Sequence, residues 1–337
     1  MAKHLMRPLD RTSYPAGAED YAPHILGAWL RAFPDSEAKD RDKEDWVENA
    51  CFIEAFEKLG VEYKILDTAA KVWISSVGDS MPDSTGERAF FHSGIMGHDH
   101  AHGVDFDLAF QKSNALKIIG EHATSPVFQK AAGRSMELVK PCSQAVDEAI
   151  RKIIPEAGEV FIKTIKKETA GRYKIEAGTS PWRQICEQDE NLIWSIIQYE
   201  GLETPYFSIQ EVIEPTYEYR MFMVGDKPVT GAGCVEAFTP LDNEDVFDPK
   251  MEERRNRSKV EHRGDLVDRY LAFALDYGKA FAAENGTELV YSLDLCVDAK
   301  TGKVVAIELN PPFNLGRYAS QIEPWVLAID AQLGNDA

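Results

Sequence analysis

The chain has 337 residues, of which 44% are hydrophobic and 28% are charged. This composition is typical of a globular protein with two or three domains and a sizeable core, and it excludes a disordered chain. Asp and Glu together number 56 against 37 for Lys and Arg, so the formal net charge is −19. A chain this acidic repels the phosphate backbone of a nucleic acid, and we expect no nucleic-acid partner.

Membrane and disulfide signals are also missing from the sequence. No run of 18 apolar residues occurs, so we expect neither a membrane span nor a membrane partner. The first thirty residues carry several charges and lack the apolar centre of a secretory signal. The five cysteines are widely spaced and contain no CxxC pair, which predicts free thiols in the core. A cytoplasmic protein is the expectation.

Helices and strands mix in the first third of the chain. Apolar residues keep helical spacing over 45–59 until Gly60, and 61–66 then read as a strand. A short amphipathic helix at 21–33 and a strand at 88–92 complete a small α/β domain that ends near residue 110.

The rest of the chain does not alternate strictly between strands and helices, which indicates an α+β fold. Residues 126–140 are expected to form a short strand and a connector. Further helices are expected at 107–120, at 143–153 with Ser143 as N-cap, at 187–200 and at 265–285, and further strands at 159–163, 206–213 and 218–224.

A hairpin near the end of the chain carries the strongest chemical signal. Residues 290–298 and 304–310 alternate in polarity around a Gly-containing turn, so they read as antiparallel strands. Glu308 and Asn310 are two apart and point to one face, and Asp294 lies opposite or diagonal to them. Three such oxygen ligands suit Mg²⁺. The alternative is a surface hairpin whose polar face only meets water.

A second signal points to phosphate. Lys163 closes an apolar strand and precedes a polar turn, 164–172, whose backbone amides can bind phosphate. Taken alone this signal is weak, because a lysine at a strand end is usually only solvated. The segments 208–215 and 217–224 follow downstream and bring several charged side chains onto two neighbouring strands.

These segments, in this order and at this spacing, resemble the ATP-grasp superfamily of carboxylate–amine ligases, of the D-alanine–D-alanine ligase and glutathione synthetase type. The resemblance covers roughly residues 105 to 325. It implies an ATP-grasp fold behind a small α/β domain, with an N-terminal domain at 1–110, a small ATP-grasp subdomain at 111–208 and a C-terminal subdomain carrying the magnesium site at 209–337.

The same resemblance implies ATP and one or two Mg²⁺ ions as cofactors and assigns the residues around them. It assigns Lys117 and Lys163 to the ATP phosphates, with Lys112 as the alternative to Lys117. Glu211 and the backbone of Val212 would contact the adenine, with Gln210 beside them, and Glu218 would bind the ribose. The metal ligands would be Asp294, Glu308 and Asn310. One departure is that the turn after Lys163 contains only Gly171, where many members have more glycine.

Further residues are expected near the substrates. Arg220 is assigned to the transferred phosphoryl group or a substrate carboxylate, since a guanidinium suits either anion. In a basic island at 254–263, Arg255 or Arg257 would touch the acyl phosphate, unless this is only a charged surface loop. Arg317 would fix a carboxylate. The loop with His98, His100 and His102 either lines the substrate site, binds a transition metal or is solvated.

The expected activity is an ATP-dependent ligation of a small carboxylate and an amine, such as an amino acid or a peptide. An acyl phosphate would form first, and the products would be an amide, ADP and phosphate. One alternative is a phosphotransferase that uses the same nucleotide cleft, and another is a non-catalytic nucleotide-binding module. The motifs identify neither substrate, and they are compatible with a homodimer.

Overall fold

The computed structural model describes residues 4–6, 8, 10–67, 72–75, 90–92, 125–164, 170–199, 201–243, 245–253, 259–310 and 316–334. Contacts divide the chain into two compact units. Unit 1 comprises Met1–Ile118, Tyr217–Leu295 and Leu309–Ala337, and unit 2 comprises Ile119–Thr216 and Cys296–Glu308. The two units are grouped by contacts, and unit 1 joins the first and last segments of the chain. They therefore do not test the three predicted domains, which remain a prediction.

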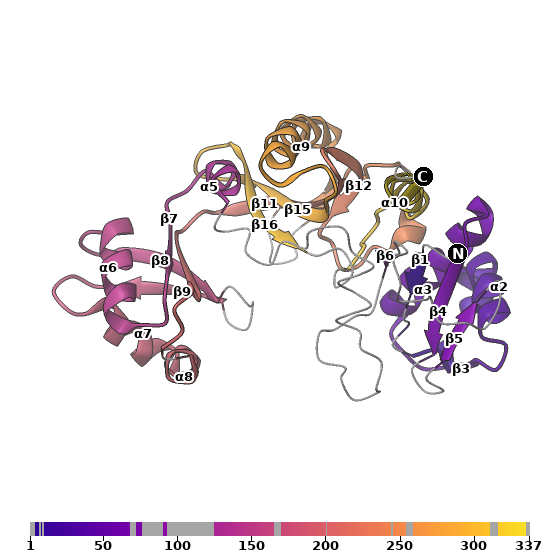
Figure 1. Cartoon of the computed structure of the whole chain (residues 1–337), viewed down its shortest axis with the longest axis horizontal. Helices are drawn as coiled ribbons and strands as arrows, with labels where there is room; N and C mark the ends of the chain where they lie inside the picture. Colours follow the sequence, from indigo (N-terminus) through magenta and orange to yellow (C-terminus); the bar gives the residue numbers. More distant parts are fainter. Residues whose placement is uncertain are drawn as a thin grey trace. The chain divides into compact units, whose positions relative to one another are not determined.

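Unit 1 begins with a mixed sheet in the order β5-β4-β1-β6, in which β1 is parallel to both of its neighbours (Figure 1). Its further elements lie around a second sheet, in the order β12-β11-β15-β16. The part of β16 up to Glu308 and the ends of β11 and β15 are grouped with unit 2. The first part of unit 1 contains β1 (His4–Met6), β2 (Ser13–Pro15), α1 (Ala18–Tyr21), α2 (Pro23–Ala32), β3 (Glu37–Lys39), α3 (Lys43–Leu59), β4 (Tyr63–Asp67), β5 (Val72–Ser75) and β6 (Phe90–Phe91).

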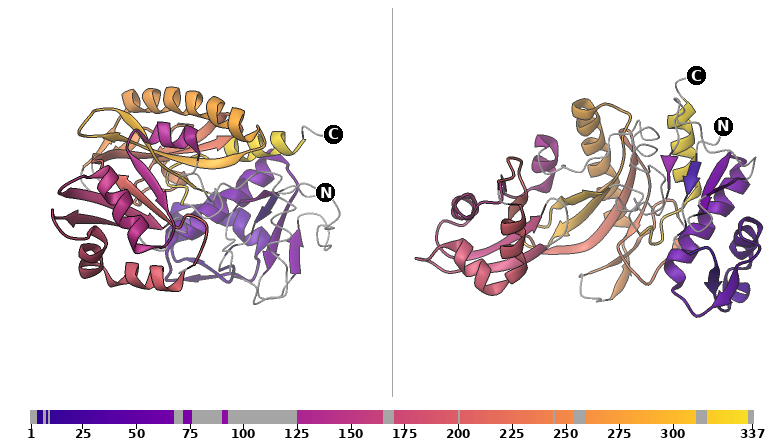
Figure 2. Two further views of the ribbon diagram at one scale, coloured as in Figure 1. Left: turned by 60° about the vertical axis from the view of Figure 1, so that its left-hand side comes forward. Right: turned by 60° about the horizontal axis from the view of Figure 1, so that its bottom comes forward.

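The second sheet carries the predicted hairpin. Helix α9 runs along one face of it, as Figure 2 shows, and Gly278 lets the helix approach the turn after β11, because a Cβ there would lie 2.4 Å from the carbonyl oxygen of Asp226. The elements are β11 (Pro215–Val224), β12 (Lys227–Gly233), the 3-10 helix η3 (Pro240–Asp242), β13 (Lys250–Glu252), β14 (Val260–His262), α9 (Gly264–Asn285), β15 (Val290–Asp298), β16 (Val304–Asn310) and α10 (Glu323–Gly334).

Unit 2 contains a sheet in the order β7-β10-β8-β9, covered on one face by α6 and α7 (Figure 1). Its core gathers Val160 and Ile162 of β8 with Ile150 of α6 and Ile185 of α7. Its elements are α5 (Pro126–Ala132), β7 (Met136–Val139), α6 (Ser143–Ile153), β8 (Gly158–Thr164), β9 (Ala170–Ile175), α7 (Pro181–Gln188), α8 (Glu190–Gln198) and β10 (Phe207–Glu211).

Most predicted elements are confirmed, including the long helix α9 and the hairpin strands β15 and β16. The prediction of a strand and a connector at 126–140 was wrong for its first half, which is helix α5. The Ser125 hydroxyl accepts a hydrogen bond from the backbone N–H of Phe128, and Gly133 ends the helix with φ +62°. The predicted helix at 107–120 lies outside the described residues.

Two helix predictions need a smaller correction. The single helix predicted at 187–200 is interrupted at Asp189, which has an extended backbone. The Asp189 carboxylate accepts hydrogen bonds from the Tyr173 hydroxyl at 2.7 Å and from the Asn191 backbone N–H at 2.9 Å, and these bonds stabilise the break. Helix α6 has the predicted bounds, but Cys142 and not Ser143 is the N-cap residue, and it makes no side-chain cap bond.

One core in unit 1 joins the two ends of the chain. Buried residues of α2 and α3, such as Trp29 and Phe56, belong to the same cluster as Phe222 of β11 and Trp325 of α10. None of the five cysteines, all of which the structure describes, is in a disulfide, as predicted, but only Cys51 and Cys296 are buried. None of the described helices is both long and apolar enough to cross a bilayer.

Two histidines form a polar chain inside this core. The Trp325 Nε1–H donates to Nδ1 of His92 at 3.2 Å, so His92 carries its proton on Nε2, which faces Nδ1 of His4 at 2.8 Å. The His4 Nε2–H then points to Asp330 at 3.4 Å. Burial lowers the pKa of His92 well below its usual range, and the neighbouring His4 and Arg317 lower it further, so His92 is a neutral imidazole.

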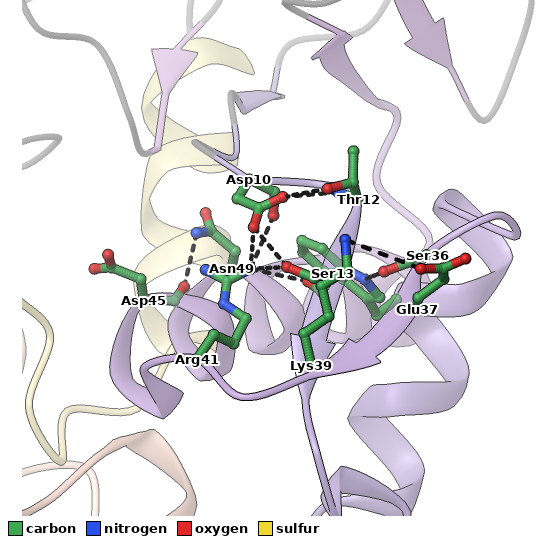
Figure 3. A network of polar contacts seen from close by, with 10 residues as sticks. Asp10, Thr12, Ser13, Ser36, Glu37, Lys39, Arg41, Asp45 and Asn49 are labelled. Atoms are coloured by element: carbon green, nitrogen blue, oxygen red, sulfur yellow. Dashed lines mark hydrogen bonds and ion pairs between the residues drawn. The ribbon is translucent and has the colours of Figure 1, made fainter.

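The loop after β1 is fixed by its own polar network (Figure 3). The Asp10 carboxylate accepts hydrogen bonds from the backbone N–H and the hydroxyl of Thr12, both at 2.9 Å. Arg41 donates to the backbone carbonyl oxygens of Asp10 at 3.1 Å and Ser13 at 2.8 Å. Burial opposes ionisation of Asp10, but these hydrogen bonds outweigh it and lower the pKa.

Candidate functional site

The hairpin strands bring two of the predicted metal ligands together. Asp294 lies on β15 and Asn310 on the neighbouring strand β16, and both side chains are buried. The Asn310 amide nitrogen donates a hydrogen bond to Oδ2 of Asp294 at 3.0 Å. Two buried polar side chains need such partners, because an unsatisfied buried polar group costs about 1 to 3 kcal/mol.

Arg220 of β11 completes this cluster with a two-point ion pair. Its Nε donates to Oδ1 of Asp294 at 2.9 Å and its Nη2 donates to Oδ2 at 2.8 Å. Burial alone would lower the pKa of Arg220, but the charge and hydrogen bonds of Asp294 raise it well above its usual value. The guanidinium therefore stays charged in a place where water does not screen it.

The segment after the hairpin holds the third nitrogen of Arg220. Nη1 donates to the carbonyl oxygen of Gly316 at 3.1 Å, and the ring of Tyr318 lies 5.2 Å from the guanidinium carbon. Tyr318 has φ +50°, a left-handed conformation that is uncommon for a residue with a side chain. The backbone strain stored there is of the kind that collects at functional sites.

In unit 2, Lys163 and Glu308 form an ion pair. Lys163 is on β8, opposite Ser208 of β10 in the register, and the alternation of the strand places it on the face away from the core residues Val160 and Ile162. The predicted phosphate lysine and one predicted metal ligand thus meet in the structure. Glu308 precedes Asn310 by two positions on β16, as the sequence requires for a shared face.

Arg134 is a residue that the sequence analysis missed. Its guanidinium donates to the carbonyl oxygens of Ala306 at 2.7 Å and Ile307 at 3.1 Å on β16, and its Nε donates to Gln210 at 2.9 Å. Burial lowers the pKa of Arg134, and the nearby Glu308 acts against that shift. No local motif marks this arginine, because all its partners except the carbonyl oxygen of Ala132 lie 76 to 173 positions away.

The residues predicted around adenine and ribose have mixed surroundings. Gln210 is buried and bonded to both Arg134 and Ser208, so its place favours a structural role over a contact with adenine. Glu211 is exposed, and the backbone carbonyl of Val212 accepts from Lys300 at 3.0 Å. Glu218 is partly buried on β11. The nucleotide roles of these residues remain predictions.

Arg317 does not lie where a substrate contact would place it. Its guanidinium is 1% exposed and packs over the rings of Phe222 at 4.3 Å, Trp325 at 4.6 Å and Phe52 at 5.1 Å. Burial lowers the pKa of Arg317, Glu48 raises it, and Arg220 lowers it. These surroundings favour a role in holding the segment after the hairpin, and not the predicted contact with a substrate carboxylate.

Several predicted site residues lie outside the described part of the chain: Lys112, Lys117, His98, His100, His102, Arg255 and Arg257. The end of the basic island is described, and it is occupied by local ion pairs. Arg263 binds Asp265 through two bonds of 2.8 Å and lies 4.5 Å over the ring of Tyr217, while Lys259 pairs with Glu261.

The donor set fits Mg²⁺ in its chemistry. Asp294 and Glu308 supply carboxylates, and Asn310 turns its amide nitrogen to Asp294, which leaves the amide oxygen on the other side of the group. Within the described ranges, no three His, Cys, Asp or Glu side chains gather into a metal site. Mg²⁺ in proteins usually keeps several waters and takes substrate phosphates as further ligands.

Comparison with known proteins identifies the fold. No protein-family model and no curated protein sequence matches the chain. D-cycloserine synthetase matches with a TM-score of 0.52 at 12% identity, over 98% of this chain and 99% of that one.

Two further solved structures match with a TM-score of 0.47. D-alanyl-alanine synthetase A from Vibrio cholerae O1 biovar eltor is 12% identical over 99% of this chain and 100% of its own. The D-alanine–D-alanine ligase from Coxiella burnetii is 10% identical over 99% and 96%. With the order of the elements, the match to D-cycloserine synthetase confirms that this chain has the α+β ATP-grasp fold that its motifs predicted.

Proposed function

We propose that the chain is an ATP-dependent carboxylate–amine ligase. One carboxylate oxygen of the substrate attacks the γ-phosphorus of ATP, the bond to the β-phosphate oxygen breaks, and ADP leaves. The amine nitrogen then attacks the carbonyl carbon of the acyl phosphate and loses a proton, and phosphate leaves with the pair of electrons from the C–O bond. The products are an amide, ADP and phosphate.

The observation that carries this proposal is the buried charge cluster of Arg220, Asp294 and Asn310. A carboxylate is a poor electrophile, so its activation by phosphoryl transfer needs positive charge held in place before the reaction. Asp294 holds the Arg220 guanidinium by two of its nitrogens, which orients the group without help from a ligand. The fold shared with D-cycloserine synthetase supports the same class of chemistry.

The remaining residues of the candidate site are assigned either to the ATP phosphates or to Mg²⁺. Lys163, together with Lys117, would bind the ATP phosphates, and Asp294, Glu308 and Asn310 would hold Mg²⁺. When bound, Mg²⁺ neutralises charge on the phosphate oxygens and orients them. Glu308 and Lys163 form an ion pair, so each group balances the charge of the other.

The residues that would contact the substrate indicate its chemical class. Arg220 suits an anion, either the substrate carboxylate or the acyl phosphate made from it. Glu211, Val212 and Glu218 would contact adenine and ribose, and Arg255, Arg257 and His100 would contact the substrates. We infer a small amino acid, a peptide or a similar metabolite as the carboxylate.

The fate of the nucleotide tests this proposal. The full chain is incubated with ATP, Mg²⁺ and a panel of amino acids and small carboxylates, with and without amines, and nucleotides and product masses are measured. ADP with an amide product is the expected result. AMP as the main nucleotide would overturn the proposal, since it indicates an acyl adenylate, and ADP with a stable phosphorylated product would indicate a phosphotransferase.

A further inference from the structure

One peptide bond after the hairpin is held from both of its ends. The backbone N–H of Arg317 donates to the Glu48 carboxylate, and the carbonyl oxygen of Gly316 in the same peptide unit accepts from Nη1 of Arg220 at 3.1 Å. The C=O and N–H groups of a peptide unit are coplanar and point in opposite directions, so fixing one fixes the other. The direction of Arg220 therefore depends on an acceptor in helix α3.

The path continues from Arg220 to the hairpin. Asp294 accepts from the other two nitrogens of Arg220 and also from Asn310. Tyr318 places its ring against the guanidinium. Every link lies within unit 1, so a continuous chain of hydrogen bonds leads from Glu48 to the candidate metal ligands. Sequence motifs could not reveal it, because Glu48 and Arg317 are separated by 269 positions.

Glu48 is a partly buried carboxyl with unusual titration. Burial is the largest cause that raises its pKa, to about 7, and the negative charges of Glu44 and Asp45 add to it. The hydrogen bond from Arg317 and the positive charge of that residue act in the opposite direction. These are the charged groups that face Glu48, two from its own helix and one from the segment after the hairpin.

We propose that Glu48 is a positioning residue for Arg220, acting through the Gly316–Arg317 peptide unit. The expected effect of Glu48 on turnover rests on the proposed function, whereas its expected effect on the Arg220 guanidinium does not. With the peptide held, Nη1 of Arg220 keeps its bond to Gly316, and the face of the guanidinium that is not occupied by Tyr318 stays directed toward the anion. Without the acceptor, the peptide is free to rotate and that orientation is lost.

Two substitutions separate the acceptor from its charge. Glu48→Gln keeps an oxygen that can accept from the Arg317 N–H, whereas Glu48→Met has a similar length and no acceptor. We expect Glu48→Met to lower kcat about tenfold, the size of one charge-assisted hydrogen bond, with little change in KM for ATP. Glu48→Gln should restore most of kcat and remove its dependence on pH near 7. Glu57→Gln is the matched control, because it removes an exposed carboxylate from the same helix α3, nine positions after Glu48.

A second measurement does not need activity. In the full chain labelled with ¹⁵N-arginine, the Nε–H signal of Arg220 is identified by its loss in Arg220→Lys. We expect this signal to shift in Glu48→Met, to stay near its wild-type position in Glu57→Gln, and in Glu48→Gln to match the wild type at low pH, where Glu48 is neutral. In the wild type the signal should titrate with a midpoint near that of Glu48. If Glu48→Met does not fold, the proposal is tested by the pH titration of the Arg220 signal, which should occur in the wild type and be absent in Glu48→Gln.

The outcomes separate the two proposals. If no carboxylate supports ADP release, the proposed function fails while the Arg220 signal still tests the path from Glu48. A signal that ignores both the Glu48 variants and pH overturns the inference. So does a shifted signal in Glu48→Met with unchanged kcat in an active ligase, because the contact would then be structural only.

Discussion

Both oxygens of Asp294 accept hydrogen bonds from Arg220, and one of them also accepts from Asn310. At the scale of single residues, the candidate site is therefore a set of buried charges that are already paired in the protein. Such pairs contribute little net stability when complete, but removing one partner leaves a buried charge without compensation. The site should be sensitive to substitutions that alter charge without altering volume.

The first prediction concerns that compensation. Asp294→Asn keeps the shape of the side chain but leaves Arg220 charged and buried, and we expect it to lower the free energy of unfolding by about 3 kcal/mol. Urea denaturation followed by circular dichroism measures the loss. Asp276→Asn, on the exposed side of α9, is the control, and an equal effect of the two substitutions would contradict the assignment.

The second prediction concerns Glu308. Glu308→Gln removes the charge that pairs with Lys163 and that would bind Mg²⁺, so we expect turnover to fall about 100-fold or more while the fold is retained. ADP release in Mg²⁺ and the circular dichroism spectrum are the measurements. Glu159→Gln, which affects an exposed ion pair with Arg172 in the same unit, should leave turnover unchanged. Undiminished turnover in Glu308→Gln would remove this residue from the site.

At the scale of elements, long periodic segments such as α9 and the hairpin could be predicted because their patterns are local. The break at Asp189 could not be predicted, since it depends on the hydroxyl of Tyr173, which the fold brings close. The candidate site divides in the same way. Motifs predicted roles for Arg220, Lys163 and the hairpin ligands, whereas Glu48 and Arg134 have partners that only the tertiary structure supplies.

Helix α5 offers a test at this scale, because its cap was overlooked in the sequence although Ser125 and Pro126 are a common helix start. Ser125→Ala removes the hydroxyl that accepts from Phe128, and we expect the helix to lose about 1 kcal/mol. Hydrogen exchange of the amides at 128–132 reports this loss. Ser143→Ala, at the start of α6 but not its cap, should change the exchange of that helix far less.

For the whole molecule, the raised pKa of Glu48 links folding to pH. Between its usual value of 4.5 and about 7, the folded chain binds a proton that the unfolded chain has released, so stability falls as pH rises through this window. We expect wild type to lose about 1 to 3 kcal/mol relative to Glu48→Gln between pH 5 and pH 8, after allowance for partial exposure.

Urea midpoints of the two proteins at both pH values measure this difference, and the comparison cancels the contributions of other carboxylates. Glu57→Gln again serves as the control, because it removes the same charge from an exposed position on α3. If Glu48→Gln and wild type showed parallel stability at both pH values, Glu48 would titrate near its ordinary pKa.

The core of unit 1 takes residues from both α3 and α10, helices that begin 280 positions apart at Lys43 and Glu323. A ribosome makes the first of these long before the second, so the apolar face of α3 emerges without its final partner. Unit 2 consists mainly of residues 119–216 and is synthesised well before α10. Vectorial synthesis therefore exposes the amino-terminal segment to chaperones and to aggregation until the last helix is released, and a stalled or shortened translation product would retain that exposed surface.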